Sequence, residues 1–157
     1  LIGTRATVKS GLYQKVIQKA DPEIQVIGQP CPLFVPLVEE GWLKDEITVA
    51  VARRYLEPLL EQEIDTLILG CTHYPLLRSL LKELVGEQVT LVNPAYETAL
   101  ALKRMLEDKG LLREGKEEEE FPYRFFVSDE EEYFQKFANS ILPYDVKSTK
   151  QIQIEEY

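Results

Sequence analysis

The sequence is poor in cysteine and histidine, and this scarcity narrows the classes of protein to consider. Its 157 residues include two cysteines and one histidine. Two cysteines make no disulfide framework, so the chain is expected in a reducing compartment, the cytoplasm. One histidine and two thiols are also too few for an ordinary four-ligand zinc site unless carboxylates complete it. No metal is therefore expected.

Long apolar runs and an excess of positive charge are also missing. No apolar segment approaches the length of a membrane span and no signal-peptide pattern is present, so no membrane partner is expected. The formal net charge of −9 argues against non-specific binding to nucleic acid. The same charge gives an anionic ligand no general attraction, so any anion site must be built locally.

Short apolar runs alternate four times with helical patterns. Strands are expected at the start of the chain and at 24–27, 67–69, 89–92 and 123–127. Helices are expected at 6–20, 45–60, 76–85 and 96–109, and after Ser128, which has capping-box spacing to Glu131. The alternation predicts an α/β fold, an open parallel sheet with helices on both faces.

The turn after the run 67–69 carries Cys71, Thr72 and His73. Turns of this kind line the ligand crevice at the carboxyl edge of an open parallel sheet. A thiol, a hydroxyl and an imidazole at a helix N-terminus form a reactive group, because the helix end lowers a thiol pKa and binds anions. The alternative is a small buried cysteine of purely structural importance, and the neighbouring histidine favours function.

Three stretches resemble signature segments of the second half of bacterial glutamate racemase. They are Ile2-Gly3-Thr4-Arg5-Ala6-Thr7-Val8-Lys9-Ser10-Gly11, Cys31-Pro32-Leu33-Phe34-Val35-Pro36-Leu37-Val38-Glu39 and Leu69-Gly70-Cys71-Thr72-His73-Tyr74-Pro75. They stand in the family's order with similar spacing. The resemblance covers nearly the whole chain, weakens after about residue 105, and implies the Rossmann-like lobe of the aspartate/glutamate racemase family.

The resemblance implies an isomerase that works without pyridoxal phosphate, metal or any other cofactor. It would interconvert L- and D-glutamate and supply D-glutamate for peptidoglycan. In the family, two lobes enclose the substrate and each contributes one cysteine. One thiolate removes the α-proton and the opposite thiol delivers a proton to the other face. Two groups are required because a single base returns the proton to the side from which it came.

The family's roles carry over to six residues of this chain. The resemblance gives Cys71 as the second acid/base cysteine, His73 as the histidine that poises it, and Glu39 as the glutamate near it. It gives Thr72 as a ligand of the substrate carboxylate, His73 as a second substrate-binding residue, and Thr4 and Thr7 as threonines of the pocket. Cys31 matches a position that is not catalytic.

The family's first lobe, with an Asp-Ser-Gly stretch and the other catalytic cysteine, has no counterpart here. We therefore expect a fragment that is inactive alone. Residues 1–93 would form the lobe with the second cysteine, and residues 94–157 a segment that completes the absent lobe. Two alternatives stay open: an arylmalonate-type decarboxylase, which needs one thiol, and a non-catalytic gyrase-binding role. A homodimer also stays open.

Overall fold

The computed structural model describes residues 1–113 and 123–156, so the glutamate run 117–120 lies outside the described residues. The chain forms two compact units, Leu1–Leu112 and Arg113–Tyr157. Helix α6, Pro94–Asp108, groups with the first unit, whereas the predicted boundary lies after residue 93. The idea that residues 94–157 complete another lobe stays a prediction.

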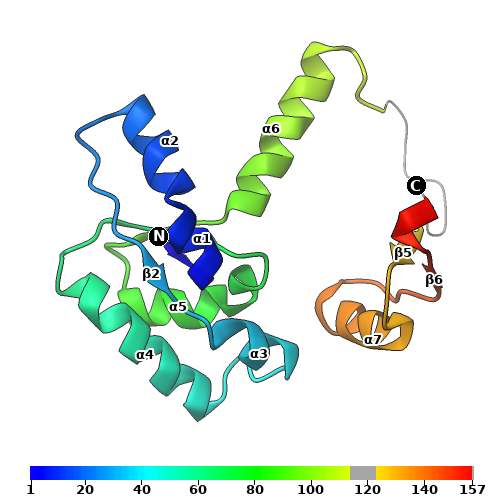
Figure 1. The fold of residues 1–157 in the computed structure, drawn as a ribbon, viewed down its shortest axis with the longest axis horizontal. Coiled ribbons are helices and arrows are strands. Elements are labelled where there is room, and N and C mark those ends of the chain that lie inside the picture. Colours follow the sequence, from blue (N-terminus) through cyan, green and yellow to red (C-terminus); the bar gives the residue numbers. More distant parts are fainter. Residues whose placement is uncertain (114–122, 157) are drawn as a thin grey trace. The chain divides into compact units, whose positions relative to one another are not determined.

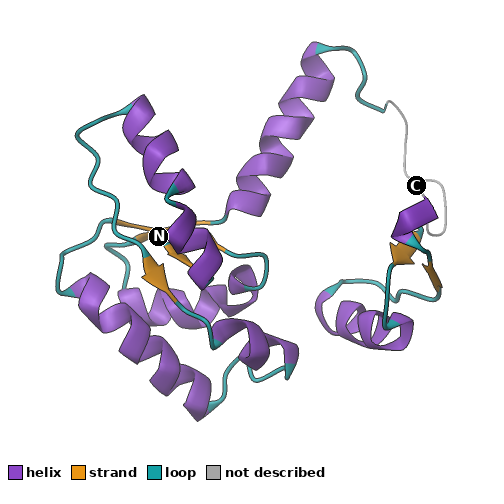
Figure 2. Cartoon of the chain, in the orientation of Figure 1, coloured by secondary structure: helices purple, strands orange, loops and turns teal. Residues whose placement is uncertain are grey.

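The first unit is built on a parallel sheet of short strands, as the alternating pattern predicts. The strands are β1 (Ile2–Gly3), β2 (Gln29–Pro30), β3 (Thr66–Gly70) and β4 (Thr90–Val92). Their order is β2-β1-β3-β4, and every neighbouring pair is parallel. Figure 2 shows these strands in orange among the helices. The open parallel sheet of the α/β prediction is confirmed.

Helices lie on both sides of this sheet (Figure 1). On one side are α3 (Phe34–Glu39), α4 (Glu46–Leu60) and α5 (Arg78–Val85), and on the other are α1 (Arg5–Ser10), α2 (Leu12–Ala20) and α6. The Asp45 carboxylate accepts a hydrogen bond from the Ile47 N–H at 2.8 Å and so caps α4 where the pattern predicts a helix start. The core includes the side chains of Ile2, Leu56, Leu67, Leu69, Leu77 and Leu81.

Two local predictions in this unit are wrong. The single helix expected at 6–20 is two helices, because Gly11 takes a left-handed backbone angle, φ 63°, between them. The strand expected at 24–27 lies instead at Gln29–Pro30. The Gln29 and Cys31 N–H groups bond to β1, while Pro30, which lacks an N–H, fits the outward-facing position of an edge strand.

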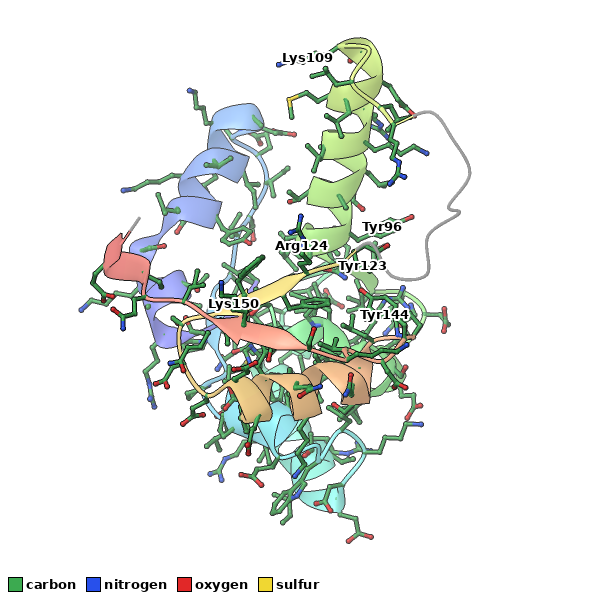
Figure 3. All side chains as sticks on the ribbon, turned by 90° about the vertical axis from the view of Figure 1, so that its right-hand side faces the viewer. Tyr96, Lys109, Tyr123, Arg124, Tyr144 and Lys150 are labelled. Carbon is green, nitrogen blue, oxygen red and sulfur yellow. The ribbon has the colours of Figure 1, made fainter. Side chains whose placement is uncertain are left out.

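The second unit is a small β-α-β arrangement. Strands β5 (Phe125–Val127) and β6 (Thr149–Gln151) pair in parallel, and α7 (Glu131–Ile141) connects them. The rings of Tyr123 and Tyr144 stack at 5.2 Å (Figure 3). The capping-box prediction is wrong, because α7 follows Glu130, which has φ 47° and provides no side-chain cap.

A 3-10 helix, Ile154–Glu156, ends the described part of this unit. Among the described residues of both units, the helices are too short or too polar to cross a membrane.

Candidate active site

The strand register places the predicted site residues at one edge of the sheet. Gly3 of β1 pairs with Pro30 of β2 on one side and with Gly70 of β3 on the other. The next residue of each strand, Thr4, Cys31 or Cys71, therefore leaves the sheet at the same carboxyl edge. This is the edge at which open parallel sheets bind ligands.

Gly70 lets β3 approach β1 closely just before Cys71. A Cβ atom at residue 70 would lie 2.9 Å from the Ile2 carbonyl oxygen and 2.6 Å from the Leu1 Cδ1. A backbone oxygen cannot move aside as a flexible side chain can, so any larger residue would push the two strands apart. Because residue 70 is glycine, β3 can stay paired with β1 up to the residue directly before Cys71.

Four of the predicted site residues converge in and around this turn. The His73 Nδ1 lies 4.0 Å from the Cys71 Sγ and 3.2 Å from the Thr72 Oγ1. On the other side of the ring, the His73 Nε2 lies 3.2 Å from the Glu39 Oε1 at the end of α3. The structure thus brings together a carboxylate and an imidazole that are 34 residues apart in sequence.

The chemistry of this row follows from its donors and acceptors. An ionised carboxylate only accepts hydrogen bonds, so the contact with Glu39 requires a proton on the His73 Nε2. A neutral ring then presents its Nδ1 as an acceptor toward the Cys71 thiol and the Thr72 hydroxyl. The arrangement can take a proton from the thiol or return one to it.

The helix N-terminus expected to activate Cys71 is less regular than predicted. A 3-10 helix, Tyr74–Leu77, follows the turn, and α5 begins only at Arg78. The N-terminal N–H groups of α5 are therefore several residues from the thiol. Within this turn, the imidazole of His73 lies 4.0 Å from the Cys71 thiol.

Thr4 and Thr7 form a pair at the start of α1. The Thr7 N–H donates to the Thr4 Oγ1 at 3.1 Å, and the two hydroxyl oxygens lie 2.9 Å apart. This is the helix cap of α1, and it holds both half-buried hydroxyls beside the sheet edge. Their contact with a substrate stays a prediction.

Cys31 is enclosed in the core, whereas Cys71 is partly exposed. The Cys31 side chain has 0% exposure, and its thiol donates to the Gln29 carbonyl oxygen at 3.6 Å. Burial raises the pKa of this thiol to about 12. Among the described residues, no group of three or more His, Cys, Asp or Glu side chains could hold a metal ion.

Tyr74 is a residue of this site for which the sequence predicts no role. Its side chain is fully buried, and its hydroxyl donates to the Cys31 carbonyl oxygen at 2.8 Å. The sequence carries only a weak sign of this bond, a tyrosine directly after the turn. Its partner is 43 residues away and could be found only from the fold.

The two thiols are expected to differ strongly in their reaction with iodoacetamide at pH 7. A thiol with a pKa of about 12 holds about one part in 10⁵ as thiolate at this pH, and Cys31 is also buried. Cys71, which is partly exposed, should react at least about tenfold faster. Peptide mass spectrometry after short exposures measures both rates. Equal rates, or faster labelling of Cys31 in the folded chain, would contradict this assignment.

Comparisons with known proteins show which proteins this chain resembles. No family model matches the chain. The chain is 42% identical over 155 residues to the glutamate racemase of Geobacter metallireducens, covering 99% of this chain and 57% of that protein. Its fold matches a crystal structure of Francisella tularensis glutamate racemase in complex with D-glutamate, with a TM-score of 0.87 and 33% identity over 99% of this chain and 58% of that one.

The glutamate racemase of Thermus thermophilus in complex with beta-chloro-D-alanine gives a TM-score of 0.80 at 35% identity, over 99% of this chain and 56% of that one. The sheet, its carboxyl-edge turn and these likenesses define a member of the aspartate/glutamate racemase family. Within that family, the chain belongs with the glutamate racemases. It spans a little more than half the length of these relatives.

Proposed function

We propose that this chain supplies one face of an active site that interconverts L- and D-glutamate without a cofactor. The observation that carries the proposal is the row Cys71, His73 and Glu39 at the carboxyl edge of a sheet whose relatives are glutamate racemases. A thiol next to an imidazole that can accept its proton is suited to acid/base chemistry at a carbon atom.

In the proposed reaction, the Cys71 thiolate takes the α-proton of one enantiomer and becomes a thiol. The electron pair of the broken C–H bond stays on the substrate, delocalised into the α-carboxylate. A thiol on the opposite side then delivers its own proton to the other face of the α-carbon and becomes a thiolate. The reverse direction uses the same groups in opposite roles, with Cys71 as the donor.

The second acid/base group must come from outside the residues of this chain. The sequence has one cysteine besides Cys71, and Cys31 is buried with a raised pKa at the same sheet edge. The relatives have about two fifths of their length beyond the part that this chain matches. We assign the opposite thiol to that additional part, with residues 94–157 completing its lobe.

Substrate binding is assigned to the hydroxyl groups of the site. Thr72 would bind the substrate carboxylate through its hydroxyl and backbone N–H, and Thr4 and Thr7 would line the pocket. Such local donors are necessary because the net charge of −9 offers glutamate no general attraction. The reaction would supply D-glutamate for peptidoglycan in the cytoplasm.

A one-thiol decarboxylase of the arylmalonate type would need only Cys71. The identity of 42% to a glutamate racemase over 155 residues favours racemisation. Release of CO₂ from an arylmalonate by this chain would support the decarboxylase instead.

Replacing Glu39 by alanine tests the proposed row directly. The protein for this experiment, called the assembled protein below, is this chain fused to the part of the Geobacter metallireducens racemase that it does not match. The loss of a hydrogen bond to a charged group, about 1.5 kcal/mol, should slow racemisation by about tenfold. Circular dichroism of glutamate over time gives the rate.

Glu40→Ala is the matched control for this measurement, because Glu40 is exposed, follows Glu39 directly and lies outside the row. It should leave the rate unchanged. Equal rates for the Glu39→Ala and unmodified assembled proteins would remove Glu39 from the mechanism.

A further inference from the structure

Tyr74 connects two segments that meet at the candidate active site. Its side chain has 0% exposure, and its hydroxyl donates to the Cys31 carbonyl oxygen at 2.8 Å. Its ring packs edge-on against Phe34, with centroids 5.2 Å apart and an interplanar angle of 90°. Burial raises the pKa of the Tyr74 phenol, so the group stays protonated and remains a donor.

Each segment held by Tyr74 carries one partner of the Glu39–His73 contact. His73 directly precedes Tyr74 in the chain. The Cys31 carbonyl oxygen also accepts from the Phe34 N–H at 3.2 Å, at the start of α3, and Glu39 is the last residue of that six-residue helix. The clamp, defined as Tyr74, Cys31 and Phe34, therefore joins the catalytic turn to the helix that carries Glu39.

The Glu39–His73 contact is too weak to hold these segments together without such a clamp. The side chains of His73 and Glu39 are 26% and 42% exposed, and ion pairs at such positions are weakened by water. A buried hydrogen bond with edge-on aromatic packing is not weakened in this way. The position of Glu39 against His73 thus depends on the buried hydrogen bond between Tyr74 and Cys31.

We propose that Tyr74 is a positioning residue whose hydroxyl fixes α3 against the Cys71–His73 turn and so holds the Glu39 carboxylate at the His73 Nε2. The placement is a property of the fold, and only its consequence for catalysis rests on the proposed function. Through Glu39, the clamp decides which ring nitrogen of His73 carries the proton, and it leaves the Nδ1 toward Cys71 as the acceptor.

The single histidine of the chain makes a direct test possible. With ¹⁵N-labelled histidine, only His73 gives ring-nitrogen signals. At alkaline pH, where imidazoles are neutral, a ring held in one tautomer shows two widely separated nitrogen shifts, whereas a ring exchanging between tautomers shows shifts that converge. We expect wide separation in the unmodified 157-residue chain and convergence in both Tyr74→Phe and Glu39→Ala.

Tyr55→Phe is the matched control. The Tyr55 ring also packs edge-on against Phe34, at 5.3 Å and 86°, but its hydroxyl is not the one that bonds to Cys31. This variant should keep the separated shifts. The double variant with Tyr74→Phe and Glu39→Ala should match Glu39→Ala alone, because the clamp acts through the carboxylate.

Phe34→Leu is a second route to the same test. It loosens the clamp from the α3 side while keeping the Tyr74 hydroxyl, and it should also bring the shifts together. A dispersed amide spectrum shows which variants are folded. Separated His73 shifts in every folded clamp variant, or equal convergence in Tyr55→Phe, would overturn the proposal.

Activity of the assembled protein separates this inference from the proposed function. Tyr74→Phe should lower its turnover about as much as Glu39→Ala, with little change in KM. Convergent shifts in a protein that does not racemise glutamate would uphold the positioning role and contradict the proposed function. If the assembled protein racemises glutamate but the His73 shifts are the same with and without the Tyr74 hydroxyl, the proposed function would be upheld and the positioning role contradicted.

Discussion

Replacing Cys71 by serine in the assembled protein is expected to abolish detectable racemisation. The rate should fall by a factor on the order of 10²–10⁴. A serine hydroxyl is far less acidic than a thiol, so neither His73 nor solvent generates enough of its anion to take the α-proton. The substitution changes one atom in a partly exposed turn, so the fold should survive. Circular dichroism of glutamate over time gives the rate.

Solvent deuterium provides a second reading of the Cys71→Ser protein. The group on the opposite face is intact, so it should still remove and return a proton on its own side. We expect slow exchange of the α-proton in one enantiomer without inversion. Mass spectrometry of recovered glutamate measures this exchange.

Cys31→Ser is the control for this substitution. The side chain at residue 31 is buried and lies outside the proposed chemistry, so a folded Cys31→Ser protein should keep its turnover. The opposite result would contradict the assignment: if the Cys71→Ser protein still racemises glutamate and the folded Cys31→Ser protein does not, Cys31 is the catalytic thiol.

The 157-residue chain by itself is expected not to racemise glutamate, and the assembled protein is expected to do so. Inversion needs a base that removes the proton from one face of the α-carbon and an acid that delivers one to the other face, and this chain offers one suitable thiol. The chain without the second acid/base group should therefore racemise glutamate more slowly than the assembled protein by a factor on the order of 10²–10⁴, as expected for the loss of Cys71. A separately produced partner portion should also restore activity when it is mixed with the chain.

The measurement compares equal concentrations of the chain, the partner portion, their mixture and the assembled protein. Circular dichroism follows both directions of the reaction, starting from L- and from D-glutamate. Full racemisation by the chain alone would contradict the two-face mechanism, because it would require both protons to pass through groups on this chain.

The local elements of the fold could be predicted from the sequence because their causes are local. Helix α4 begins after Asp45, whose carboxylate caps it, and β3 matches a short apolar run ended by Gly70. The parallel sheet followed from the alternation of such elements. The errors were also local: Gly11 interrupts a helical pattern, and Pro30 lies in a two-residue edge strand too short to show a pattern.

The candidate site was predicted in part, for a similar reason. Cys71, Thr72 and His73 are neighbours in sequence, and a strand-to-helix turn places such a group at the sheet edge. Glu39 was predicted as a site residue only because the stretch that contains it resembles a segment of glutamate racemases. No rule of spacing connects it to His73 across 34 residues.

Residue types and local patterns in the sequence therefore determined the fold class, the position of the turn that carries Cys71 and His73, and the family. Tertiary structure alone decided which side chains act on one another. The Glu39–His73 contact and the Tyr74–Cys31 hydrogen bond join residues 34 and 43 positions apart. Both depend on α3 packing against the 3-10 helix that follows the turn. Such packing depends on the shapes of side chains from several elements at once, and a pattern along one segment does not contain them.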